Sequence, residues 1–147
     1  MDWSARAKQV FKLTKPEHFT DYTHCCECEE HDTTLRSCDV DSIGLGELGN
    51  PGWDPMCFAT AIGKLYYTPA LVRLSLDTLS TGFYLEQFLF HLNGDGENNE
   101  WVMSCNQEQR TFICDFLTYI LENYADVLDV NMASDDLLRA YMIWGCG

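Results

Sequence analysis

Residues 104–124 read SCNQEQRTFICDFLTYILENY, and this stretch carries the clearest helical signal in the chain. Ser104 to Gln107 fits a capping box, the pattern that often begins a helix. Apolar residues then recur every three or four positions, while Asp115, Thr118 and Glu122 lie opposite them. The apolar positions are Phe112, Ile113, Phe116, Leu117, Ile120, Leu121 and Tyr124. This spacing predicts an amphipathic helix with one face in a core.

Four other segments have helical patterns, namely residues 3–15, 68–79, 83–92 and 134–145. Thr68 and Pro69 form an N-cap followed by proline at the first helical position. Asn93 and Gly94 supply a stop signal after the third segment. The sequence therefore predicts a mainly α fold, a compact bundle of about five helices.

Weaker patterns fill the remaining parts of the chain. Residues 42–54 are rich in glycine and predict a short helical turn followed by an ordered loop. Residues 57–67 are consistent with one small β-hairpin. Because we find no internal repeat, low-complexity tract or long linker, we expect residues 1–147 to form a single acidic helical domain.

Residues 24–31 read HCCECEEH, which places five thiol or imidazole side chains within eight residues. Zinc prefers four such ligands in a tetrahedron, and ligands close in sequence lower the entropic cost of assembling a site. A helix would point His24, Cys28 and His31 the same way. In a metal knuckle, Cys25 and Cys28 would chelate the ion and His31 would close the site.

Both arrangements use Cys28 and His31, with Cys25 and His24 as alternatives for the third and fourth positions. The sequence therefore predicts a zinc-like metal site at His24, Cys25, Cys28 and His31. We expect the metal to be structural and to organise a segment that is poor in apolar residues.

The cysteines allow alternatives to this metal-ligand set. Because no second Cys-x-x-Cys pair follows, Cys38 or Cys57 could complete the site. A reduced thiol cluster without metal is a second possibility. Redox chemistry is the weakest interpretation, because the flanks do not indicate a βαβ unit and the acidic neighbours would oppose a low thiol pKa. In the remaining helical segments, Cys105, Cys114 and Cys146 are expected to be small buried thiols.

The charge of the chain is strongly negative and unevenly distributed. The formal net charge is −14, from 23 Asp and Glu against 9 Lys and Arg. Residues 1–15 carry +3, from four bases and one acid, and residues 16–147 carry −17, from five bases and 22 acids. Direct binding to nucleic acid phosphates is therefore disfavoured.

Location is inferred from apolar runs and cysteine usage. The chain has no uncharged apolar run of membrane-spanning length, and its first residues do not resemble a secretory signal. We therefore expect a cytoplasmic protein with reduced thiols that does not interact with a membrane.

Several motifs together resemble an uncharacterised family of small, mainly helical bacterial proteins. The shared features are the run at residues 24–31, the run Leu48 to Pro55 that reads LGNPGWDP, the helix start at Tyr67 to Leu71, and Gln109-Arg110 before a helix. The resemblance covers residues 20–125. It implies a mainly helical fold in which the cluster and the loop form one feature, and it implies no reaction.

These observations favour a non-enzymatic, acidic binding protein of the inhibitor or immunity type, or a mimic of nucleic acid charge, that recognises a basic protein surface. We predict no catalytic residues. The alternative is a small zinc-dependent hydrolase in which Glu27 or Glu30 acts as general base. The sequence lacks the His-Glu-x-x-His motif and the zinc deaminase signature that would favour this alternative.

Overall fold

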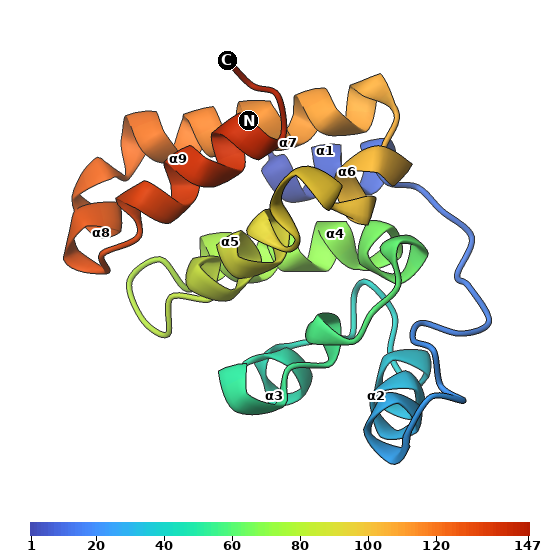
Figure 1. The fold of residues 1–147 in the computed structure, drawn as a ribbon. Helices are drawn as coiled ribbons and strands as arrows, with labels where there is room; N and C mark the ends of the chain where they lie inside the picture. The colour runs from blue at the N-terminus through green and yellow to red at the C-terminus, as the bar shows by residue number, and fades with distance from the viewer. The chain divides into compact units, whose positions relative to one another are not determined.

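Nine α-helices and three short 3₁₀ helices form the fold of the computed structural model, which describes residues 1–147 (Figure 1). Contacts divide the chain into two compact units. The N-terminal unit comprises residues 2–74 and the C-terminal unit residues 75–147, with Met1 grouped with the latter. The boundary falls inside α4, after Leu74. Each unit is described separately below.

The N-terminal unit contains α1 (Trp3–Val10), α2 (Cys26–Arg36), α3 (Leu45–Leu48), η1 (Pro51–Trp53), η2 (Pro55–Cys57) and most of α4 (Ala61–Asp77). The C-terminal unit contains α5 (Leu85–Asn93), η3 (Gly96–Asn98), α6 (Glu100–Ser104), α7 (Gln107–Asn123), α8 (Ala125–Val130) and α9 (Ser134–Ile143). The prediction of a mainly α fold is confirmed. The count of about five helices was too low, because short helices such as α3, α6 and α8 carry little periodicity.

The predicted β-hairpin at residues 57–67 is wrong. Instead, η2 ends at Cys57 and α4 begins at Ala61, and the only β pairing is an isolated bridge between Thr20 and Ala59. The Thr60 hydroxyl accepts the N–H of Gly63 at 3.1 Å, which is an N-cap interaction. A capped start therefore favours a helix where the sequence suggested a turn.

The predicted helix start at Thr68 and Pro69 is also wrong, because both residues lie inside α4. Proline lacks an N–H and normally ends or bends a helix. The residues beside Pro69 in α4, namely Tyr67, Ala70 and Leu71, are fully buried. Burial of this apolar segment therefore offsets the local helix-breaking preference of Pro69.

The predicted amphipathic helix at residues 104–124 is confirmed as α7, but its capping box lies two residues later. Asn106 Oδ1 accepts the N–H of Gln109 at 2.8 Å, and Gln109 Oε1 accepts the N–H of Asn106 at 2.9 Å. Ser104 instead ends α6. The buried face of α7 includes Phe112 and Phe116, as the periodicity predicts.

Helices α5, α7, α8 and α9 pack together in the C-terminal unit, with contacts between α5 and α9 and between α7 and both α8 and α9. Aromatic rings fill the space between them. Phe88 lies 6.1 Å from Phe116 between ring centroids, and Trp101 lies 5.4 Å from Trp144. These contacts form a conventional apolar core.

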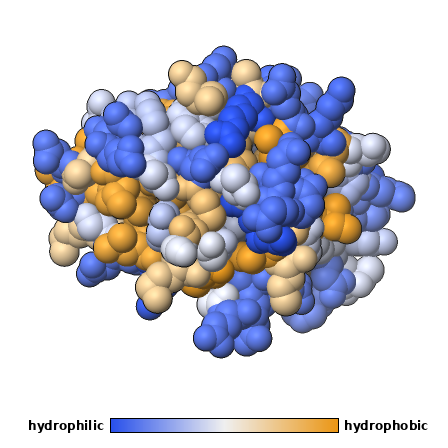
Figure 2. Space-filling model, turned by 90° about the horizontal axis from the view of Figure 1, so that it is seen from above, coloured by the Kyte–Doolittle hydropathy of each residue, from blue (hydrophilic) through white to orange (hydrophobic).

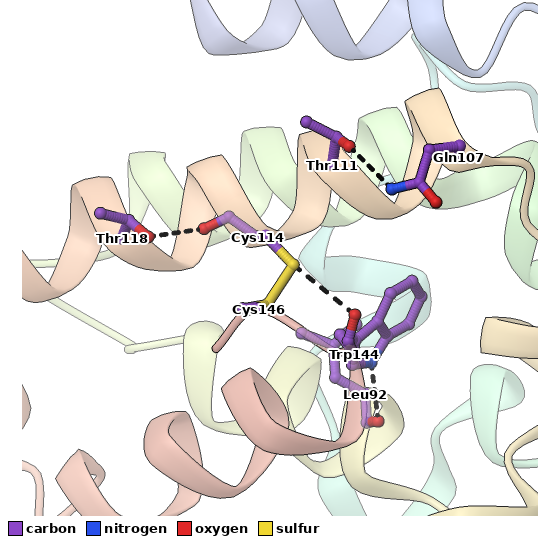
Figure 3. Close-up of a disulfide and its surroundings, with 7 residues drawn as sticks. All are labelled: Leu92, Gln107, Thr111, Cys114, Thr118, Trp144 and Cys146. Carbon is purple, nitrogen blue, oxygen red and sulfur yellow. Dashed lines mark hydrogen bonds between the residues drawn. A yellow bond between two sulfur atoms is a disulfide. The ribbon is translucent and has the colours of Figure 1, made fainter.

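A disulfide between Cys114 and Cys146 joins the middle of α7 to the tail that follows α9 (Figure 3). The expectation that both are reduced thiols is therefore wrong. Trp144 is held nearby, since its indole N–H donates to the carbonyl of Leu92 at 3.0 Å. The two cysteines are 32 residues apart in sequence, so only the packing of α9 on α7 brings them together.

Polar and apolar groups are mixed on the molecular surface, as Figure 2 shows for one face. In the C-terminal unit, Met132 and Met142 are 88% and 79% exposed. None of the helices combines the length and the apolar character that crossing a membrane requires.

Candidate metal centre

The Cys/His cluster lies at the start of α2, and its backbone settles whether this segment is a helix or a knuckle. Cys25 is the N-cap of α2, with extended backbone angles (φ −162°, ψ 172°). Its Sγ accepts the backbone N–H of Cys28 at 3.4 Å, the interaction that an oxygen makes in an ordinary N-cap. The Cys25-x-x-Cys28 spacing therefore caps the helix and brings the second sulfur back to the first.

Three of the four predicted ligands come together at this point. Cys25 Sγ lies 3.2 Å from Cys28 Sγ, and His24 Nδ1 lies 3.8 Å from Cys28 Sγ. The three ligand atoms all lie within 4.8 Å of one another. Two sulfurs bound to one tetrahedral zinc lie about 3.8 Å apart, and a sulfur and a nitrogen about 3.5 Å apart. The two measured separations, from Cys28 Sγ to Cys25 Sγ and to His24 Nδ1, each differ from these values by about half an ångström.

The same contacts control the pKa values of the thiols. The pKa of Cys25 is lowered to about 7, chiefly by the backbone N–H of Cys28 and then by the Cys28 thiol and His24. The pKa of Cys28 is raised, because its thiol donates to Cys25 and because burial disfavours its charged form. Cys25 is therefore the sulfur that ionises first.

The expectation that acidic neighbours oppose a low thiol pKa holds for Cys28, because the charges of Asp21 and Glu27 help to raise its pKa. For Cys25, hydrogen bonds to the sulfur dominate instead. The pKa of His24 is raised, mainly by its hydrogen bond with Cys25. Protons therefore compete with a metal ion for His24 more strongly than they would for a free imidazole.

The cluster is open on one side and closed on the other. His24 and Cys25 are exposed, whereas Cys28 is only 8% exposed. Glu27, Glu29 and Glu30 are exposed on the following helix but are not part of the convergent group. Their negative charges add to the attraction for a cation without supplying ligand atoms.

His31 does not join the other three predicted ligands. Its imidazole is fully buried between two aromatic rings, with centroids 4.5 Å from Phe58 and 4.3 Å from Trp53. Neither ring nitrogen has a hydrogen-bond partner. Trp53 belongs to the run Leu48 to Pro55, so this loop contacts His31 through a tilted pair of rings.

Asp32 holds α2 in place, and the sequence analysis missed this residue. Its carboxylate is 3% exposed and accepts the backbone N–H groups of Phe19 at 2.6 Å and Thr20 at 3.1 Å. His18 Nδ1 also lies 2.7 Å from the other carboxylate oxygen. Burial would raise the pKa of Asp32, but these hydrogen bonds outweigh it and the pKa is lowered.

Further contacts hold both ends of α2. The Thr20 hydroxyl donates to the carbonyl of Cys28 at 2.6 Å. At the other end, Lys15 Nζ donates to the carbonyls of Arg36 at 2.8 Å and Cys38 at 2.6 Å. Leu35 is fully buried. Hydrogen bonds and apolar contacts therefore hold both ends of α2, and a structural role for a metal stays a prediction.

The two cysteines proposed as a distant ligand are not part of the convergent group. The Cys38 thiol lies 3.8 Å from the Ser37 hydroxyl. The backbone carbonyl of Cys38 accepts a hydrogen bond from the Tyr67 hydroxyl at 2.9 Å. Cys57 is the last residue of η2 and its pKa is raised, chiefly by burial. The convergent group therefore offers three possible ligand atoms from the protein.

Comparisons of the chain with protein-family models, curated proteins and solved structures found no match. The resemblance to a family of small bacterial proteins therefore has no support beyond the mainly helical fold.

Proposed function

We propose that this chain is a non-enzymatic, acidic binding protein that holds a zinc ion at His24, Cys25 and Cys28 and recognises a basic protein surface. The convergence of these three ligand atoms within 4.8 Å is the observation that carries the metal part of the proposal. Two sulfurs and one imidazole nitrogen are a donor set that zinc accepts readily. Zinc would supply a positive charge and a fourth, exchangeable coordination position at the exposed end of α2.

The geometry favours an exchangeable metal over a purely structural one. Structural zinc sites usually have four protein ligands, whereas the site at α2 has three. Moreover, α2 is already held by Asp32, Thr20 and Lys15. We therefore expect the metal-free chain to remain folded and the zinc ion to exchange with solution.

Charge supports the partner part of the proposal. The C-terminal unit has twelve Asp and Glu against two Arg, a formal charge of −10. The N-terminal unit has eleven acids against seven bases, a charge of −4. Exposed Met132 and Met142 add adaptable apolar surface to the more acidic unit. Such a surface attracts a basic protein and accelerates its association.

A metal titration tests the first part of the proposal. Reduced, metal-free protein would be titrated with zinc in competition with a chromophoric chelator. We expect one zinc per chain, and at least tenfold weaker binding in Cys28→Ser and His24→Ala. Cys26→Ser is the matched control, because Cys26 is an exposed neighbouring thiol outside the group. Equal affinity in the wild type and Cys28→Ser would contradict the proposal.

The same titration separates the observed ligand set from the one predicted from sequence. His31→Phe preserves the stack on Phe58 while removing both ring nitrogens. We expect its zinc affinity to equal that of the wild type. A tenfold loss would return His31 to the ligand set.

The partner part is tested by association kinetics with a lysine-rich histone as the probe. The association rate should fall steeply between about 0.05 and 0.2 M salt, because screening shortens the reach of the charges. Replacing Asp135 and Asp136 with Asn should slow association further at low salt. A rate that does not change with salt would contradict electrostatic recognition.

A small zinc-dependent hydrolase remains the second candidate, because three ligands leave one position for a water molecule. In that case Glu27 or Glu30 would act as general base. Zinc-dependent hydrolysis of an activated ester that is lost in Glu27→Gln or Glu30→Gln, with zinc still bound, would favour the enzyme. No hydrolysis above that of free zinc would favour the binding protein.

Cytoplasmic residence stays a prediction, and the Cys114–Cys146 disulfide counts against it. Disulfides persist mainly in oxidising compartments, whereas cytosolic thiols are generally kept reduced. The proposed metal site needs reduced Cys25 and Cys28, while the C-terminal unit contains an oxidised pair.

A further inference from the structure

The distance between the Cys25 and Cys28 sulfurs is intermediate between that of a disulfide bond and that of two sulfurs bound to one zinc ion. Their separation is 3.2 Å, whereas a disulfide bond is about 2.05 Å long and two sulfurs on one zinc ion lie about 3.8 Å apart. Closing the disulfide requires an approach of about 1.2 Å, which side-chain rotation at an exposed N-cap residue can supply. The pair is therefore placed for direct bond formation as well as for metal binding.

The two sulfurs differ in their access to other molecules. Cys25 is exposed, while Cys28 is buried beneath it at 8% exposure. An incoming disulfide can therefore reach Cys25 but not Cys28. The backbone N–H of Cys28 points at Cys25 Sγ, where it stabilises the negative charge that this sulfur carries as it attacks a disulfide. Access and hydrogen bonding thus assign different roles to the two residues.

We propose that Cys25 and Cys28 carry out thiol–disulfide exchange with small or exposed disulfides. Cys25 Sγ attacks one sulfur of the substrate disulfide, forms a mixed disulfide and releases the first substrate thiol. Cys28 Sγ then attacks Cys25 Sγ, forms the Cys25–Cys28 disulfide and releases the second thiol. The substrate gains two electrons and the two protons lost by the cysteines, so no further reactant is needed.

This activity goes beyond the proposed metal binding and does not depend on it. Both processes use the same two sulfurs, so each excludes the other at any moment. A zinc ion would occupy the electron pairs that the exchange requires, and oxidation would remove both thiolate ligands from the zinc. The metal-free, reduced chain is therefore the form in which the exchange is tested.

The experiment treats metal-free, reduced full-length protein with oxidised glutathione as the probe, followed by rapid thiol blocking and peptide mass spectrometry. The wild type should form a Cys25–Cys28 disulfide with no glutathione retained on either of these two residues. Cys28→Ser should stop at a stable mixed disulfide on Cys25. Cys25→Ser should leave Cys28 unmodified, because Cys28 is buried.

Cys26→Ser is the matched control and should give the same product as the wild type, because Cys26 is exposed but does not pair with either sulfur. Glutathione retained on Cys25 of the wild type would overturn the proposal, as would equal modification of Cys25 and Cys26 without an internal disulfide. Peptide mapping also separates this bond from Cys114–Cys146.

The same samples keep this proposal distinct from the metal site. An internal disulfide in a chain that binds no zinc would support the exchange and refute the metal. Zinc binding in a chain that forms no internal disulfide would do the opposite. If the chain both binds zinc and forms the internal disulfide, zinc-loaded protein should react with oxidised glutathione at least tenfold more slowly than metal-free protein. Equal rates would contradict the use of the same two sulfurs by both processes.

Discussion

The N-terminal and C-terminal units use cysteine in opposite ways. In the N-terminal unit, Cys25 and Cys28 are three residues apart, unbonded, and open to solvent on one side. In the C-terminal unit, Cys114 and Cys146 are 32 residues apart and joined as a disulfide. The first pair belongs to a site where chemistry can occur, whereas the second pair secures the end of the chain.

The comparison teaches that the spacing of cysteines in sequence indicates their role only when the residues are near neighbours. Cys25 and Cys28 meet because one helical turn returns the second sulfur to the first. Cys114 and Cys146 meet only because α9 packs against α7. The two pairs should therefore respond differently to reductant, to metal and to mutation.

The largest effect should come from breaking the C-terminal pair. Cys114→Ser removes a cross-link that closes a loop of 32 residues, which is expected to lower the free energy of unfolding by about 4 kcal/mol. Urea unfolding without reductant measures this loss. Cys26→Ser, which removes an exposed thiol, should change the midpoint very little. Equal midpoints for Cys114→Ser and the wild type would refute the bond.

The next largest effect should come from Asp32, which holds α2 without metal. Asp32→Ala leaves the buried N–H groups of Phe19 and Thr20 without their acceptor, at a cost of about 3 kcal/mol. Chemical unfolding in the presence of a chelator measures this cost. A loss below about 1 kcal/mol would show that α2 is held mainly by other contacts.

The lowered pKa of Asp32 also leads us to expect that the stability of the fold decreases at acidic pH. Because its pKa is lowered in the folded state, its contribution to stability is complete above the unfolded pKa of about 4. That contribution is lost as the pH falls below about 4, through the lower folded-state pKa. Asp32→Asn should therefore unfold with a weaker dependence on pH in this acidic range, and an identical dependence would contradict the assignment.

Zinc should produce a smaller and conditional stabilisation of the N-terminal unit. At a free zinc concentration one hundred times the dissociation constant, binding adds about 2.7 kcal/mol to the free energy of unfolding. Cys28→Ser should lose this increment, while Cys114→Ser should retain it despite its lower baseline. Thermal unfolding with and without zinc measures both, and an equal increment in wild type and Cys28→Ser would argue against the site.

The smallest effect should be the enhanced reactivity of Cys25. With its pKa at about 7, half of Cys25 is thiolate at neutral pH, against a few per cent of an ordinary thiol. Alkylation by iodoacetamide at pH 7 should be about tenfold faster in the folded chain than in denatured protein. Cys28→Ala removes the side-chain hydrogen bond that helps to lower the pKa of Cys25 and should reduce this difference. A folded-state rate no higher than the denatured rate would contradict the lowered pKa.

Much of the fold could be predicted from sequence because helical periodicity is a local property. The buried stripe of α7 follows directly from the spacing of Phe112, Ile113 and Phe116. The start of α4 could not be predicted, because Thr60 and Pro69 send conflicting local signals that only tertiary contacts resolve. The Cys114–Cys146 disulfide could not be predicted either, because the two residues are 32 positions apart in sequence and meet only through the packing of α9 on α7.

The candidate site was predictable in part. The run at residues 24–31 drew attention to His24, Cys25 and Cys28, whose possible ligand atoms converge at the start of α2, while their role as metal ligands stays a prediction. His31 has suitable chemistry and helical spacing, but Phe58 and Trp53 bury it elsewhere. Helical spacing states which side of a helix a residue occupies, and not what packs against that side.

Zinc X-ray absorption spectroscopy of the zinc-loaded, reduced chain tests the central claim most directly. The account predicts two sulfur ligands at about 2.3 Å and one imidazole nitrogen at about 2.0 Å, with a fourth light-atom ligand from solvent. Cys28→Ser should reduce the sulfur number to one. A coordination shell without sulfur, or one with four sulfurs, would contradict a metal centre built from His24, Cys25 and Cys28.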